Sequence, residues 1–248
     1  MDRHHDAARL LLSARRDPSQ RLHSLPEAIR PQTETQAYLV QRAVMAELGG
    51  IGGWKVGSPG PDGPVNCAPL PAGGIGDSPM ASHSAMRGVE AEIGVRLARS
   101  LPPREQPYDA AEVMAAVGSM HPIIEVLDSR YLDPDAVDPL SALADSLSHG
   151  GLVVGPAIPE WRDVDLRTEH VRMLVGGAEI KARTGNPAGD MVRLLVWLAN
   201  VGSLWAGGLQ AGQVVTTGSW TGKDLAPPGS EARAVFARCG DAVVRFVQ

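Results

Sequence analysis

The stretch Arg87–Pro102, RGVEAEIGVRLARSLP, decides how this 248-residue sequence is interpreted. Apolar and acidic residues alternate in its first half, and a period of two over this length is typical of a β-strand. One face of the strand would carry Val89, Ala91, Ile93, Val95 and Leu97 toward a core. Glu90 and Glu92 would lie side by side on the other face, with Cα atoms roughly 6.5 Å apart at the usual rise of a strand. Two like charges therefore share one face with no basic residue between them.

Two interpretations of this glutamate pair are open at this point. An antiparallel sheet often exposes one face to solvent, where glutamates are common. Alternatively, two parallel carboxylates form most of a site for a hard cation such as Mg²⁺ or Mn²⁺, which take oxygen ligands. The strand by itself does not separate the two, so the choice depends on the rest of the chain.

Composition excludes several classes of protein. A hydrophobic fraction of 44% and a charged fraction of 21% are ordinary for a soluble globular protein. The net charge of −5 gives no electrostatic signature for nucleic acid. Cys67 and Cys239 are too few for a disulfide framework or a cysteine-rich zinc site. The apolar run before Arg15 is too short for a signal peptide, and residues 194–209 are too few and too interrupted to span a bilayer. We expect a cytoplasmic protein with no nucleic-acid or membrane partner.

Helical spacing of apolar residues predicts five helical regions. Their limits are 6–16, 34–48 (ending at Gly49-Gly50), 108–120 with Asp109 as a possible cap, 138–151, and a long buried helix over 189–205. Residues 1–48 are thus expected to form a helical N-terminal segment. Residues 49–248 are expected to form one structural unit.

Short strands separated by turn residues dominate the remainder. They are expected over 53–57, 65–70, 89–97, 121–131, 152–155 and 213–220, with hairpins over 169–183 (turning at Gly176-Gly177) and 231–248. Most lie too close together for regular crossover helices between parallel strands. The sequence therefore predicts an α+β fold with a curved, mainly antiparallel or mixed sheet core and flanking helices.

Familiar catalytic motifs are absent from the sequence. It holds no G-x-G-x-x-G after a strand, no H-E-x-x-H and no G-x-S-x-G, and GSWTGKD is one residue short of a phosphate loop. Four scattered histidines are interpreted as surface or loop residues: His83, His121, His149 and His170.

Polar residues do interrupt the apolar strands at a few positions, namely Lys55, Glu125, Asp128, Thr216, Thr217 and Ser219. Lys55 lies between Trp54 and Val56, so its ammonium either extends to solvent or pairs with buried carboxylates. The glutamates supply suitable partners for the second arrangement.

The order of these segments resembles a known group of enzymes. GWKVG, VEAEIGVRLARSLP, HPIIEVLDSRY, DSLSHGGLVVG and LQAGQVVTTGSWTG together are similar to the 2-keto-4-pentenoate hydratase and 4-oxalocrotonate decarboxylase group of the fumarylacetoacetate hydrolase superfamily. The similarity runs from about Thr33 to the C-terminus. It implies a mixed β-sandwich roll in residues 49–248, a catalytic core that uses Mg²⁺ or Mn²⁺, and a homo-oligomer.

The resemblance also implies roles for particular residues. Its metal ligands fall on Glu90, Glu92 and Glu125, and its motif lysine falls on Lys55. Its loop against the bound substrate falls on Thr217, Gly218 and Ser219. Lys55 is therefore a candidate for substrate binding and, with Glu90, for catalysis. The chain departs from the group at Ala91, at 145–148 and at 185–190.

Asp128 is not expected to be a ligand beside Glu125. Acids three residues apart on a regular strand point to opposite sides. We expect Asp128 to pair with Arg130 or a backbone group, so that both lie behind the ligands.

The implied chemistry is shared by several reactions. A cation at such a site acts as a Lewis acid toward the C2 oxygen of a 2-oxo or 2-hydroxydienoate substrate. Lys55 would transfer a proton or bind a carboxylate if its pKa were depressed. No second basic cluster is evident for a second substrate carboxylate. We therefore expect a hydratase of aromatic-compound catabolism that converts a 2-hydroxy-2,4-dienoate to a 4-hydroxy-2-oxo acid. A 4-oxalocrotonate-type decarboxylase is the runner-up, followed by a carbon–carbon hydrolase and a non-catalytic binding or assembly subunit.

Overall fold

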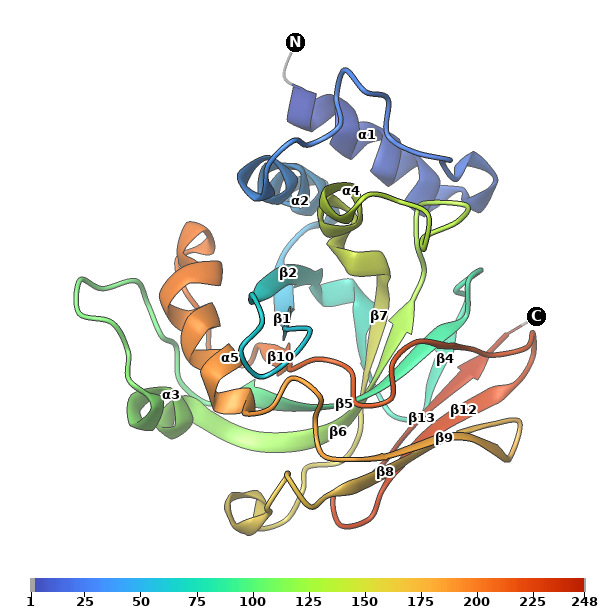
Figure 1. The fold of residues 1–248 in the computed structure, drawn as a ribbon. Helices are drawn as coiled ribbons and strands as arrows, with labels where there is room; N and C mark the ends of the chain where they lie inside the picture. Colours follow the sequence, from blue (N-terminus) through green and yellow to red (C-terminus); the bar gives the residue numbers. More distant parts are fainter. Residues whose placement is uncertain (1–2, 248) are drawn as a thin grey trace.

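Residues 3–247 are described by a computed structural model, and in this part of the chain the strands form two sheets (Figure 1). The larger has eight strands, in the order β2-β1-β10-β5-β6-β7-β3 with β11 paired to β5. Their bounds are β1 Ile51–Gly57, β2 Asn66–Pro71, β3 Ile75–Asp77, β5 Gly88–Leu97, β6 Val117–Leu127, β7 His149–Val154, β10 Val214–Thr216 and β11 Asp224–Leu225.

The smaller sheet has five strands among the same residues, in the order β4-β13-β12-β8-β9. Their bounds are β4 Met80–Ser82, β8 His170–Val175, β9 Ala178–Thr184, β12 Glu231–Phe236 and β13 Gly240–Phe246. Parallel pairs (β1 with β10, β3 with β7, β4 with β13) occur among antiparallel ones. The predicted mixed α+β architecture is confirmed, as are the hairpins β8–β9 and β12–β13.

The main core lies between the two sheets. The face of β5 that carries Val89, Ala91 and Ile93 packs in one apolar cluster with residues of β8, β12 and β13 such as Met173, Ala234 and Val244. This confirms the strand predicted from the alternation. Burial of this apolar face stabilises the position of β5.

Helices α1 (Arg3–Arg16), α2 (Glu34–Leu48) and α4 (Pro139–Ala144) lie together on the opposite side of the larger sheet from the smaller sheet (Figure 1). Their apolar faces share a second cluster. The side chain of Thr33 caps α2 by accepting a hydrogen bond from the N–H of Gln36, and the helix ends at Gly49 with φ +91°, a conformation that glycine adopts without strain.

The remaining helices, α3 (Ala110–Ala116) and α5 (Met191–Trp197), are shorter than predicted. Asp109 and Glu112 form a capping box at the start of α3, but the chain turns into β6 at Val117. Residues 117–120 pair with β5, so non-local strand pairing overrides their helical pattern. After α5, a π-helical turn over Leu198–Gly202 ends the regular helix, and Val201 and Leu204 are exposed instead of buried.

Helix α4 also ends earlier than predicted. It stops at Ala144, and Ser146, Leu147 and Ser148 adopt left-handed φ angles of 52°, 53° and 65° before β7 begins. Both cysteines are buried free thiols. Among the helices of residues 3–247, none combines the length and the hydropathy that a bilayer crossing needs.

Candidate metal centre

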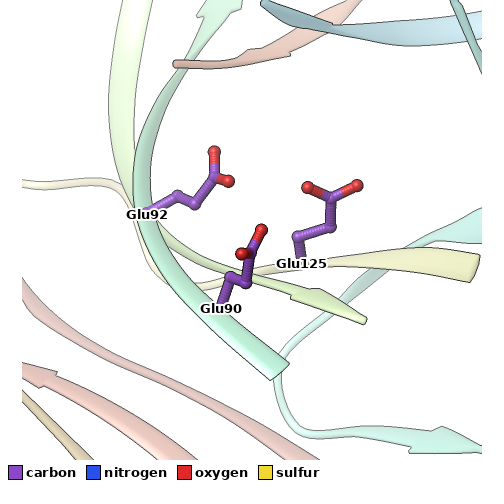
Figure 2. Close-up of side chains that lie close together, drawn as sticks. All are labelled: Glu90, Glu92 and Glu125. Atoms are coloured by element: carbon purple, nitrogen blue, oxygen red, sulfur yellow. The ribbon is translucent and has the colours of Figure 1, made fainter. Parts of the chain in front are cut away.

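Strand register brings three carboxylates to one place on the larger sheet. Glu90 on β5 is the direct cross-strand partner of Glu125 on β6, and Glu92 lies two residues further along the same face of β5. One carboxylate oxygen from each lies within 4.8 Å of the others. Figure 2 shows the three side chains extending to the same side of the sheet.

These carboxylates are not on a solvated face. Glu92 is 1% exposed, Glu125 is 0% exposed, and Glu90 is half-buried. The interpretation of the glutamate pair as the wet face of an antiparallel sheet is therefore wrong. Like charges directly opposite one another destabilise a sheet, so this arrangement needs a compensating group.

Lys55 on β1 supplies part of that compensation. Its Nζ lies 2.7 Å from Oε1 of Glu125 and 3.4 Å from the carbonyl oxygen of Leu147, and its side chain is 12% exposed. The predicted pairing with a carboxylate is confirmed, and the alternative of a lysine extending to solvent is wrong.

Strand β10 and the loop after it hold the other two carboxylates. The hydroxyl of Thr216 and the N–H of Gly218 both donate to Oε2 of Glu92, the latter at 3.0 Å. Ser219 lies close enough to Glu90 to lower the pKa of its carboxyl group. Thr217 donates instead to the carbonyl oxygen of Ile93, so its hydroxyl is occupied away from the three carboxylates. The predicted loop thus contacts the glutamates through two of its three residues.

Gly94 makes this approach of β10 possible. A Cβ at this position would lie 2.7 Å from the carbonyl oxygen of Val215 and 2.4 Å from a methyl group of Ile123. Because glycine lacks this atom, Thr216 pairs directly with Gly94 and lies close to Glu92.

His149 is a site residue that the sequence interpretation missed. It begins β7, is 1% exposed, and its Nδ1 lies 2.9 Å from Oε1 of Glu125. Its interpretation as a surface or loop residue is wrong. The same interpretation is wrong for His121, which is buried in β6 with Nδ1 at 2.8 Å from the carbonyl oxygen of Gly155. The position of His149 in the chain, just before the buried run Leu152–Val154, was the available signal. Since Glu125 accepts the hydrogen bond from His149, Nδ1 of that ring carries the proton.

The turn before His149 is strained and firmly anchored. Three consecutive non-glycine residues with left-handed φ cost roughly 1–2 kcal/mol each. Asp145 opposes this cost: its carboxylate forms an ion pair with Arg130 and accepts hydrogen bonds from the Arg130 N–H (3.1 Å) and the Ser129 hydroxyl (3.2 Å). The anchored turn presents the Leu147 carbonyl to Lys55.

Asp128 and Arg130 lie behind this turn, outside the group of three carboxylates. Asp128 pairs with Arg21 and accepts a hydrogen bond of 3.0 Å from the N–H of Met86. The expected contact of Asp128 with a backbone group is confirmed. Asp128 also contacts Arg130, but through its backbone carbonyl oxygen, which accepts a hydrogen bond from Nη1 of Arg130. Arg130 forms its ion pair with Asp145 instead.

The electrostatic potential at the site is strongly negative. Burial, followed by the charge of Glu125, raises the pKa of Glu90 to about 7 and that of Glu92 to about 8. Burial would also raise the pKa of Glu125, but Lys55 and His149 outweigh it and lower that pKa. Burial would depress the pKa of Lys55, yet Glu125 and Glu90 outweigh it and raise it. The expected depressed lysine pKa is therefore not what the structure favours.

The donor set fits a divalent hard cation. When all four groups are ionised, three carboxylates and one ammonium leave an excess of two negative charges. Oε2 of Glu125 is buried and has no hydrogen-bond partner among residues 3–247. A buried carboxylate oxygen without a partner is costly, and an ion would satisfy it. Glu90, Glu92 and Glu125 could thus hold an ion that prefers oxygen ligands.

Comparison with known proteins identifies relatives of this chain. The 4-oxalocrotonate decarboxylase of Pseudomonas putida is 30% identical over 179 residues, which are 72% of this chain and 66%, just under two thirds, of that enzyme. The 2-keto-4-pentenoate hydratase 2 of Dechloromonas aromatica (strain RCB) is 28% identical over 230 residues, 86% of each chain.

A solved structure shares the fold across nearly the whole chain. It is 4-oxalocrotonate decarboxylase from Pseudomonas putida G7 complexed with magnesium and adipate, with a TM-score of 0.84, 23% identity, and coverage of 98% of this chain and 97% of that one. The family model for the fumarylacetoacetate (FAA) hydrolase C-terminal region matches residues 67–247. With most of its length matched in this way, the chain belongs to the fumarylacetoacetate hydrolase family.

Proposed function

We propose that this protein is a divalent-metal-dependent hydratase that adds water to a 2-hydroxy-2,4-dienoate to give a 4-hydroxy-2-oxo acid, in the catabolism of aromatic compounds. The observation that carries the proposal is the convergence of Glu90, Glu92 and Glu125, with Lys55 bound to the last of them. The names of the relatives, hydratases and decarboxylases, support the same chemistry.

In this proposal the three glutamates hold Mg²⁺ or Mn²⁺. The bound ion would supply a Lewis acid for the carboxylate and C2 oxygens of the substrate. The buried, unpartnered Oε2 of Glu125 and the two negative charges in excess support this assignment. Glu92 is held on its other side by Thr216 and Gly218, which orient it for this role.

Lys55 acts as a proton donor in the proposed reaction. Two of its N–H groups are directed to Glu125 and Leu147, which leaves a third for the substrate. Because the surrounding glutamates raise its pKa, its ammonium keeps its proton at neutral pH and can deliver it from Nζ to a substrate carbon or oxygen.

Glu90 is the candidate acceptor of a proton from the attacking water. It is the most exposed of the three glutamates, so it is the one best placed to contact a water molecule on the substrate side. Thr217, Gly218 and Ser219 would line the substrate. Ser219 lies beside Glu90, so substrate and proton acceptor would be next to the same loop.

The second candidate is decarboxylation of a 2-oxo-3-enedioate, and Lys223 is the observation that favours it. The positive charge of Lys223 lies close enough to Glu90 to lower the pKa of that glutamate. Lys223 forms an ion pair with Asp135, which is 78% exposed. Such a surface ion pair is worth about 0–1 kcal/mol, so Lys223 could turn to a second substrate carboxylate. Lys55 and Arg130 are already held by carboxylates with at most 2% exposure. Because Lys55 and Arg130 are engaged in this way, the hydratase, whose substrate carries one carboxylate, remains the first candidate.

The test is to incubate the Mg²⁺-loaded protein separately with a 2-hydroxy-2,4-dienoate and with a 2-oxo-3-enedioate. We expect loss of dienoate absorbance with formation of the 4-hydroxy-2-oxo acid, abolished by EDTA and restored by Mg²⁺. Rapid CO₂ release without hydration would establish the decarboxylase instead. Inactivity on both substrates, with the metal bound, would favour the carbon–carbon hydrolase or a binding subunit.

We extend the proposal to assembly and organisation. We propose a homo-oligomer in the cytoplasm. Its assembly is supported by exposed apolar side chains, including Leu132 (56%), Ile180 (41%) and Leu225 (61%), and by the fully exposed edge strand β9. Residues 49–248 would form its catalytic core and residues 1–48 the covering helical segment. Light scattering on the purified protein measures the assembly, and a monomer would contradict it.

A further inference from the structure

A polar cavity lies on the far side of residues 145–151 from the metal centre. It has a volume of about 300 Å³ and lies between the end of α1, the strand β4 and the start of β7. Its lining includes Arg15, Arg21, Arg130, Ser82, Asp128 and Gly150. This volume is enough for a small ion with some of its water.

The positive groups of this cavity outnumber the negative ones. Arg130 pairs with Asp145, and Arg21 pairs with Asp128. Arg15 has no carboxylate partner among residues 3–247; its one hydrogen bond runs from Nη1 to the carbonyl oxygen of His149, at 3.3 Å. The cavity therefore holds one guanidinium whose charge is uncompensated.

The side chain of Arg21 also indicates that the cavity lacks a negatively charged group. Nε of Arg21 is buried and has no hydrogen-bond partner among the described residues. An unpaired donor on a charged group costs more than a neutral one, and a buried charge needs a partner. Burial and the neighbouring charge of Arg130 lower the pKa of Arg15 to about 10, and they outweigh the opposing charges of Asp145 and Asp128, which pair with other arginines.

We propose that this cavity is a binding site for a small oxyanion, a phosphate or a carboxylate, held by the guanidinium groups of Arg15 and Arg21. The planar donors of arginine match the oxygens of these anions and bind them with charge-assisted hydrogen bonds. The anion would neutralise Arg15 and satisfy the buried N–H of Arg21 together.

The bound anion would join α1 to the catalytic core. Arg15 belongs to α1, whereas Arg130 lies just after β6. Both donate to the carbonyl oxygen of His149, whose ring contacts Glu125 on the other side of the chain. The anion thus lies behind the metal centre, and its binding does not depend on the proposed reaction.

The test measures thermal unfolding in metal-free buffer with EDTA, so that no cation at the glutamates can recruit the anion. Potassium phosphate, potassium acetate and potassium chloride are compared at equal ionic strength. A ligand that binds only the folded state raises Tm with concentration. The variants are Arg15→Gln and, as a matched control, Arg16→Gln, the exposed neighbour on the same helix.

We expect phosphate, acetate or both to raise Tm beyond chloride, in the wild type and in Arg16→Gln. The salt that raises Tm beyond chloride identifies the oxyanion that binds. The Arg15→Gln variant should lose most of this increase. An equal increase in Arg15→Gln, or no increase beyond that of chloride, would overturn the proposal.

Calorimetry keeps the proposal testable if Arg15→Gln folds poorly. Arg15→Lys keeps the charge and loses the planar fork, and we expect it to bind the responding anion about tenfold more weakly than the wild type. If the two single variants Arg15→Lys and Arg21→Gln both bind the anion with wild-type affinity, the anion binds elsewhere and the proposal is overturned.

Discussion

Nζ of Lys55 lies 2.7 Å from Oε1 of Glu125, although β10 and β5 separate their strands in the sheet. The same oxygen lies 2.9 Å from Nδ1 of His149. Oε1 is therefore fully engaged, and Oε2 of Glu125 is left free and without a partner. One carboxylate is thus oriented by two residues through a single oxygen, a common arrangement behind metal ligands.

Replacement of Lys55 by Met should separate binding of the metal from turnover. We expect turnover to fall by at least about 100-fold, the usual contribution of a positioned proton donor. Affinity for Mg²⁺ should stay roughly the same because the three carboxylates remain. Steady-state kinetics and calorimetry measure the two quantities. Lys181→Met, at an exposed lysine of β9, is the control, and unchanged turnover in Lys55→Met would refute a chemical role.

The pair Glu125→Gln and Asp128→Asn distinguishes the third ligand. Glu125→Gln removes a charged oxygen from the centre, so we expect Mg²⁺ affinity to fall by at least about 100-fold. Asp128→Asn should leave affinity nearly unchanged, because Asp128 contacts Arg21 and Met86 instead. Calorimetric titration with Mg²⁺ decides. The assignment loses its basis if only Asp128→Asn abolishes binding.

His149→Ala should weaken metal binding without removing a ligand. The substitution takes away one of the two groups that orient Glu125, and loss of such a partner typically lowers metal affinity by about 10–100-fold. His170→Ala, at an exposed histidine of β8, should have no effect. Equal Mg²⁺ affinities in the two variants, measured by calorimetry, would contradict an orienting role for His149.

The stability of the metal-free protein should decrease as the pH rises. Glu90 and Glu92 have pKa values of about 7 and about 8 in the folded protein against an ordinary value of 4.5, so the folded state binds more protons between these limits. The contribution of these two groups to the free energy of unfolding is therefore fully present below about pH 4.5. It is lost as the pH rises through the folded-state pKa values of about 7 and about 8. The lowered pKa of Glu125 acts only below 4.5 and does not oppose this change.

We expect the metal-free Tm to fall by about 4–8 °C between about pH 7 and pH 9, on the order of 2 kcal/mol for a chain of this size. Saturating Mg²⁺ should abolish most of the decrease because the ion takes the place of the protons. Thermal unfolding in EDTA and in Mg²⁺ measures both curves. Parallel curves would show that these glutamates do not hold the ion.

Lys223→Met tests which reaction the site supports. If the hydratase proposal holds, KM and kcat for the dienoate should change by less than about threefold, because the surface pair with Asp135 contributes about 0–1 kcal/mol. A decarboxylase that uses Lys223 for its second carboxylate would instead show a KM for the enedioate raised at least about tenfold. Parallel assays on both substrates distinguish the outcomes.

Local sequence patterns predicted those features of the fold that depend on neighbouring residues. The alternation around Glu90 and Glu92 predicted β5, Gly49 predicted the end of α2, and Gly176-Gly177 predicted the β8–β9 hairpin. Each rests on a period or a turn geometry that a few adjacent residues impose. The resemblance added the grouping of Glu125 and Lys55 with the glutamate pair, which no local pattern contains.

Contacts between distant segments decided the rest. The sequence by itself determined that Glu90 and Glu92 share one face of a strand, since that follows from the pleat. Only the tertiary structure placed Glu125 opposite Glu90 and made residues 117–120 part of β6. It also determined that Arg130 forms its ion pair with Asp145 and not with Asp128. It also buried His149 against Glu125. These outcomes depend on strand register and on which charges are excluded from water together, and both are properties of the packed chain.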